Sequence, residues 1–154
     1  MKQGRLLVVD ASVAQSAGET EHPVSSACRK CLEAIRLICH RVVVTPDIQE
    51  EWDRHMSRFT RKWRRSMAAR RKPIRRLDPA SVSLDLDRYA TSARSAIEKD
   101  LRLLQAALAA DRVIVTRDDS LRVALEGRPD GAALAGTIKW INPVTDDLQV
   151  LRSL

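Results

Sequence analysis

Short aliphatic runs, each ending at or followed by a polar residue, constrain the fold of this chain more than any other feature. They cover Arg5–Val9, Val42–Val44, Arg112–Thr116 and Thr137–Ile141. Continuous apolar runs of this length are typical of strands that are buried on both faces of a parallel sheet. Aromatic residues make up only 3% of the chain, so the core must be aliphatic. We therefore expect buried parallel strands covered by helices.

Segments with helical spacing separate these runs. Thr45-Pro46 has the residue types of a helix N-cap and first turn, and Ser12 is a plausible cap for the first helix. The expected helices cover residues 11–17, 25–40, 46–56, 89–110, 120–125 and 146–154, and residues 127–136 are expected to form a loop. This alternation predicts an α/β fold, a three-layer α/β/α sandwich around a parallel sheet of four to five strands. A chain of 154 residues suits a single domain over 1–154.

Positive charge is concentrated in one segment. The chain carries a net charge of +7, yet residues 58–76 alone hold ten Lys or Arg residues and no acid. We expect a basic helical insertion at about 57–77 that contacts RNA phosphates, with Phe59 and Trp63 available to stack on bases. A solvated amphipathic helix or a contact with an acidic partner is the alternative. The candidate RNA-binding residues are Arg61, Lys62, Arg64, Arg65, Arg70, Arg71 and Lys72.

The chain start and the cysteines indicate a reducing compartment. The start MKQGRLLVVD has too short an apolar run for a signal peptide, so we expect none, and no apolar stretch approaches the roughly 18 residues of a membrane span. We expect a cytoplasmic protein without a membrane partner. Cys28, Cys31 and Cys39 share one helical face and are expected to be buried core thiols. A zinc site with His40 is disfavoured, because one helix cannot wrap four ligands around an ion.

Acidic residues follow the predicted strands. Asp10 ends the first strand and Asp118 follows the third, while Asp119 and Ser120 are suited to cap the next helix and leave Asp118 free. Since parallel strands end at one sheet edge, these acids should converge. Asp100 lies at the border of a buried helical face, three residues after Ile97.

The helix after the second strand adds Glu50 and Glu51. Glu51 is the preferred inward-pointing residue, and Glu50 stays open as the alternative. Clustered carboxylates repel one another and raise each other's pKa, which a divalent cation relieves. Oxygen ligands of this kind suit one or two Mg²⁺ or Mn²⁺ ions.

Three stretches resemble the PIN-domain family, which includes the VapC-like toxin ribonucleases. LLVVDASVA resembles the first family motif, VVVTPDIQEEW the second, and DLRLLQAALAADRVIVTRDDSL the last two. The resemblance implies that Asp10, Glu51, Asp100 and Asp118 are the catalytic, metal-binding acids. Thr116 matches a supporting hydroxyl residue, and Ser12 and Asp119 are further supporting candidates.

The resemblance implies a metal-dependent endoribonuclease that hydrolyses RNA phosphodiester bonds. It also implies a toxin role, a cognate antitoxin protein and a homodimer. The mechanism that the resemblance implies needs no histidine base, and none of the three histidines falls in a motif. Other readings stay open: a non-catalytic or regulatory PIN-like nucleic-acid-binding module, a DNA-cutting relative, or a flavodoxin- or receiver-like domain.

Overall fold

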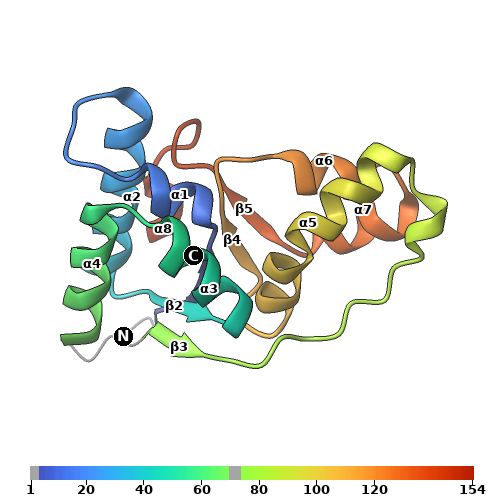
Figure 1. The fold of residues 1–154 in the computed structure, drawn as a ribbon, viewed down its shortest axis with the longest axis horizontal. Helices are drawn as coiled ribbons and strands as arrows, with labels where there is room; N and C mark the ends of the chain where they lie inside the picture. Colours follow the sequence, from blue (N-terminus) through green and yellow to red (C-terminus); the bar gives the residue numbers. More distant parts are fainter. Residues whose placement is uncertain (1–3, 70–73) are drawn as a thin grey trace.

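The computed structural model describes residues 4–69 and 74–154, and its centre is a parallel sheet. The strands are β1 (Leu6–Val9), β2 (Arg41–Val44), β3 (Ile74–Arg76), β4 (Val113–Val115) and β5 (Lys139–Ile141). They form a five-stranded sheet in the order β3-β2-β1-β4-β5, and every neighbouring pair is parallel. The α/β prediction with a parallel sheet is confirmed (Figure 1).

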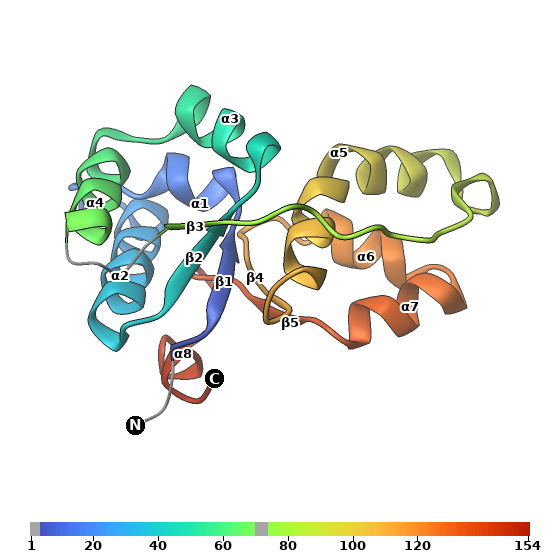
Figure 2. The same cartoon turned by 90° about the horizontal axis from the view of Figure 1, so that it is seen from below.

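Helices cover both faces of this sheet. They are α1 (Ala11–Ser16), α2 (Pro23–Ile38), α3 (Pro46–His55), α4 (Arg58–Ala69), α5 (Thr91–Leu108), α6 (Ser120–Glu126), α7 (Pro129–Gly136) and α8 (Gln149–Arg152). Figure 2 shows α5, α6 and α7 on one side of the strands and α1, α2 and α4 on the other. The expected three-layer sandwich is therefore present.

The strand order reverses between β1 and β4. The chain moves outward from β1 through β2 to β3, and then returns to add β4 and β5 on the other side of β1. Open parallel sheets bind ligands at the carboxyl ends of the strands next to such a reversal. Asp10 and Thr116 each follow one of these two strands directly.

Two expected elements were wrong. Residues 129–136 form α7 rather than a loop, because Pro129 starts a helix whose small residues Gly131 and Ala135 pack into the core. The basic segment is not helical to its end, since β3 pairs with β2 and closes one edge of the sheet. Residues 77–85 then run as an extended strap from β3 to the short 3₁₀ turn Leu86–Arg88 (Figure 2).

Buried side chains with polar atoms fix the helices to the strands. The indole Nε1 of Trp52 donates to the carbonyl of Val9 at 2.9 Å, and that of Trp63 donates to Leu32 at 2.7 Å. His40 accepts from the Arg5 amide at 3.0 Å and contacts the carbonyl of Leu151 at 2.7 Å. The imidazole therefore links α8 to the residue just before β1.

The cysteines are in part where the sequence predicted them. Cys28 and Cys31 are buried in α2, and burial raises the pKa of the Cys31 thiol to about 12. Cys39 is exposed, against expectation, because it ends the helix in the left-handed region at φ 72° and turns its side chain away from the core. In the described ranges, no helix is both long and apolar enough to cross a membrane.

Candidate active site

Asp10 is held at the carboxyl end of β1 by two hydroxyl groups. Its side chain is only 9% exposed, and its Oδ2 accepts from Ser12 at 2.7 Å and from Thr116 at 2.8 Å. Ser12 was expected to cap α1, but its hydroxyl bonds to Asp10 instead, and Asp10 occupies the cap position without a side-chain cap bond. The two supporting residues therefore orient one carboxylate oxygen and leave Oδ1 for another partner.

Asp118 lies on the neighbouring strand end and is linked to the same hydroxyl. Its backbone amide donates to the Thr116 hydroxyl at 3.1 Å. Its Oδ1 accepts from both the amide and the hydroxyl of Ser120, at 2.9 and 2.6 Å. These two bonds lower the pKa of Asp118. Asp119 was expected to cap the next helix and to leave Asp118 free. Instead Asp118 caps the turn into α6, and the exposed Asp119 makes no side-chain cap bond.

Asp100 reaches the site through a break in α5. Its backbone angles, φ −113° and ψ 15°, are not helical, and the helix bends there. The sparsely populated region around these angles often holds active-site residues. Asp100 is 8% exposed. Burial raises the pKa of Asp100, and the nearby charges of Asp10 and Asp118 raise it further. The three acids therefore share one electrostatic environment.

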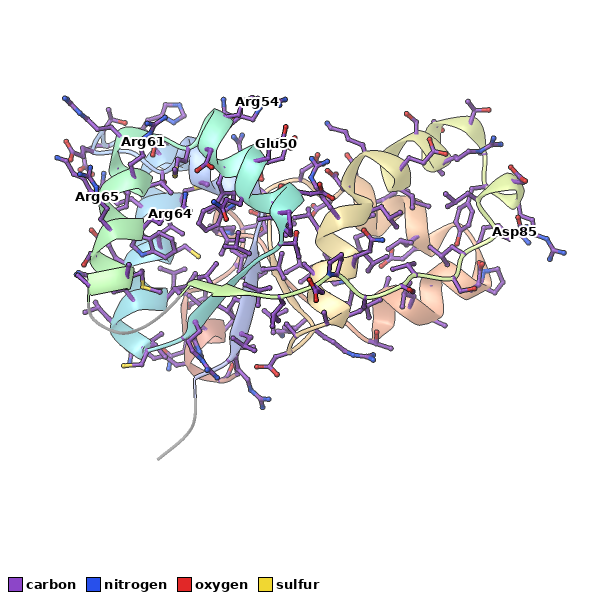
Figure 3. All side chains as sticks on the ribbon, turned by 60° about the horizontal axis from the view of Figure 1, so that its bottom comes forward. Glu50, Arg54, Arg61, Arg64, Arg65 and Asp85 are labelled. Carbon is purple, nitrogen blue, oxygen red and sulfur yellow. The ribbon has the colours of Figure 1, made fainter. Side chains whose placement is uncertain are left out.

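Glu51 is partly buried on α3 and lies beside two basic side chains. Its Oε1 lies 3.4 Å from the Nη2 of Arg102, and its Oε2 lies 4.0 Å from the Nε2 of His55. Glu50 points to solvent and pairs with Arg54 at 2.9 Å. Figure 3 shows that pair on the outer side of α3. The geometry thus favours Glu51 over Glu50.

The donor set fits a hard divalent cation, although the acids are not yet gathered around one. In the parts of the chain that the structure describes, no three His, Cys, Asp or Glu side chains are grouped closely enough to hold a metal ion. Asp10 and Asp100 are nevertheless largely buried, and within the described residues neither carboxylate forms an ion pair. Buried carboxylates without a counter-charge are costly, and Mg²⁺ or Mn²⁺ would relieve that cost.

Three basic residues around the acids were missed by sequence reasoning or left without a role. Arg117 extends from β4 and bonds to the Ser16 hydroxyl at 2.7 Å. Lys99 and Arg102 flank Asp100 on α5, and their charges lower the pKa of Asp100. Arg102 at position i+2 from an acid has no recognisable sequence signal, because its partner Glu51 is on another helix.

Of the two aromatic residues in the basic segment, Trp63 is buried and Phe59 is partly buried. Trp63 is 4% exposed and packs against Trp52 with ring centroids 6.1 Å apart, so the predicted base stacking by Trp63 is wrong. Arg61, Arg64 and Arg65 line a hollow of about 390 Å³ on α4. Figure 3 shows these arginines along α4, with Arg64 on the side toward α3.

Two of the candidate RNA-binding residues on α4 have acidic neighbours. Arg64 pairs with Asp53 at 2.8 Å, and Lys62 lies 3.8 Å from Glu19. Within the described ranges, Arg61 and Arg65 form no ion pair. The remaining candidates, Arg70, Arg71 and Lys72, lie outside the described residues.

Comparison of this chain with models of known protein families and with curated proteins finds no match. The resemblance to PIN domains is therefore carried by the motif residues quoted above. What the chain does must be inferred from the site itself.

Proposed function

We propose that this chain is a metal-dependent endoribonuclease that hydrolyses RNA phosphodiester bonds with Mg²⁺ or Mn²⁺ held by its carboxylates. One observation supports this most directly. Asp10 and Asp100 are both more than nine-tenths buried, at the carboxyl edge of a parallel sheet, where the strand order reverses. Buried acids without a bonded base serve no obvious purpose in stability, but they suit the binding of a cation.

The residues of the site would have three roles: holding the ion, orienting Asp10 and binding the substrate phosphate. Asp10, Asp100 and Asp118 would hold the ion, which when bound supplies a Lewis acid for the scissile phosphate. Ser12 and Thr116 fix the orientation of Asp10 through the bonds described above. Arg117 donates to Ser16 of α1 and directly precedes Asp118 in the chain. Its guanidinium can donate hydrogen bonds to a phosphate oxygen of the substrate.

RNA is proposed as the substrate because of the charge on α4. This helix carries five Lys or Arg residues and no acid over Arg58–Ala69. Arg61 and Arg65 are exposed on it and available to phosphates. With Trp63 in the core, contact with the backbone rather than with bases is expected from this surface.

The Asp10→Asn variant tests the proposal. We expect RNA cleavage in Mg²⁺ or Mn²⁺ to fall by at least about 100-fold, the scale of losing a main electrostatic group. The fold should persist, because the amide oxygen of Asn can still accept from Thr116. Cleavage of a labelled RNA is measured with and without EDTA, beside Glu50→Gln as a matched control on the exposed face of α3. Cleavage that is unchanged in Asp10→Asn, or that persists in EDTA, would refute the proposal.

A second candidate function is a nucleic-acid-binding module without catalysis. The ion pair between Glu51 and Arg102 favours it, because the fourth acid is already neutralised within the chain. The same cleavage assay separates the two. RNA binding without metal-dependent cleavage, by wild-type protein that is correctly folded, would favour the binding module.

A further inference from the structure

Arg102 occupies a place between two acids of the site. It lies two residues after Asp100 on α5, and its Nη2 is 3.4 Å from the Oε1 of Glu51 on α3. Both side chains of this pair are 28% exposed, so water screens them less than it screens the exposed Arg54–Glu50 pair on the same helix. One guanidinium thus faces acids that come from two different helices.

The position of α3 makes this contact relevant to the site. Trp52, the neighbour of Glu51, donates to the carbonyl of Val9, the residue just before Asp10. The first turns of α3 are therefore fixed beside the end of β1. The charge of Arg102 also reaches Asp100, whose pKa it lowers, so this one guanidinium links Glu51 to the buried carboxylates.

We propose that Arg102 is an internal counter-ion that holds Glu51 while the site is empty, and that Glu51 exchanges it for the divalent ion on metal binding. This inference rests on the metal site of the proposed function. An arginine stays protonated at all ordinary pH values, so it does not release Glu51 by titration. The exchange is a competition between two cations for one carboxylate. Arg102 therefore lowers the affinity for metal, and Glu51 becomes a metal ligand only when the ion displaces Arg102.

The competition can be measured with the metal alone, by titrating Mn²⁺ into the full-length protein and following heat release. We expect Arg102→Gln to bind Mn²⁺ about tenfold more tightly than wild type, on the scale reported for outer-sphere partners of metal ligands. Arg102→Lys, which keeps the positive charge, should stay near the wild-type affinity. Far-UV circular dichroism and thermal melts verify that each variant is folded.

Removing any positive charge near the acids should also raise the affinity for a cation. Two further variants therefore separate the role of Glu51 from this general effect. Lys99→Gln removes a neighbouring charge that forms no ion pair in the described structure, and it sets the size of the general effect. The double variant Glu51→Gln/Arg102→Gln should bind Mn²⁺ no more tightly than Lys99→Gln does, because the gain of Arg102→Gln requires Glu51. With the single variant Glu51→Gln measured as well, the four proteins form a cycle that gives the coupling between Arg102 and Glu51.

The outcomes separate the inference from the proposed function. If Arg102→Gln gains no more than Lys99→Gln, or if its gain survives in the double variant, the counter-ion role is refuted while the metal site stands. If neither wild type nor any folded variant binds Mn²⁺, the metal site and the counter-ion role are both refuted.

Discussion

Asp10 and Asp100 are equally buried but differ in what surrounds them. Asp10 accepts two hydroxyl hydrogen bonds, which fix the orientation of its carboxylate. Asp100 accepts no hydrogen bond from the described residues, and burial together with neighbouring carboxylates raises its pKa. A carboxylate whose burial lowers the stability of the folded chain is common at functional positions.

This difference predicts how stability depends on pH. Asp100 binds its proton more tightly in the folded chain than in the unfolded chain, so folding stability falls as pH rises upward from its ordinary pKa of 3.8. Asp100→Asn should therefore be more stable than wild type at neutral pH, with a melting temperature higher by about 2–4 °C per kcal/mol gained. The gain should vanish below pH 3.8, where both forms are neutral.

Thermal melts between pH 3 and pH 8 measure this effect, and Asp87→Asn on a side chain that is 94% exposed is the control. A wild-type protein that is as stable as Asp100→Asn at pH 7 would show that the buried carboxylate carries no penalty.

At the scale of elements, the packing of α3 and α4 decides how accurately the site is placed. Each helix carries one buried tryptophan whose indole bonds to a carbonyl of another element. The two tryptophans contact each other, so α3 and α4 form one support. Only Trp52 bonds to β1, at the residue before Asp10.

Replacing either tryptophan with Phe should cost stability, but only one replacement should affect the site. Trp52→Phe and Trp63→Phe each remove one buried hydrogen bond, which costs about 1–3 kcal/mol when an acceptor is left unsatisfied. Trp52→Phe should in addition weaken Mn²⁺ binding and cleavage, because the end of β1 loses its anchor. Urea unfolding and Mn²⁺ titration compare the two variants. Equal losses of metal affinity at equal losses of stability would contradict the specific role of Trp52.

At the scale of the whole molecule, the two kinds of charge are separated. The buried acids lie at the reversal of strand order, while α4 carries its arginines beside the carboxyl end of α3. The ion pair between Arg64 and Asp53 joins α4 to α3, the helix that carries Glu51. An RNA strand could then be held by its phosphates on α4 while another part of it reaches the acids.

Arg61→Gln/Arg65→Gln should weaken RNA binding without changing the metal site. Each phosphate contact releases counterions, so the double variant should reduce the slope of log affinity against log salt by about one to two. Fluorescence anisotropy of labelled RNA from 50 to about 200 mM KCl measures this slope. Lys30→Gln/Lys139→Gln removes the same charge from exposed positions elsewhere. An equal change of slope in both double variants would exclude a localised binding surface on α4.

The sequence by itself determined the fold class and placed the candidate acids Asp10 and Asp118 after strands. Aliphatic runs such as Leu6–Val9 favour buried strands, and an acid directly after such a strand of a parallel sheet lies at the sheet edge. The preference for Glu51 over Glu50 followed from helical spacing with Ile48. These features are local, because periodicity and chain neighbours are enough to fix them.

Only the tertiary structure decided what each acid bonds to. Glu51 pairs with Arg102, which is on another helix. Ser12 and Ser120 could each have capped a helix, but Ser12 donates to Asp10 and Ser120 donates to Asp118. The break in α5 at Asp100 is also tertiary, because no Gly or Pro marks it and the helix bends where its acid enters the core. Trp63 looked like a stacking platform among arginines, yet it fills the space under α4, because burial of its large apolar surface outweighs contact with solvent.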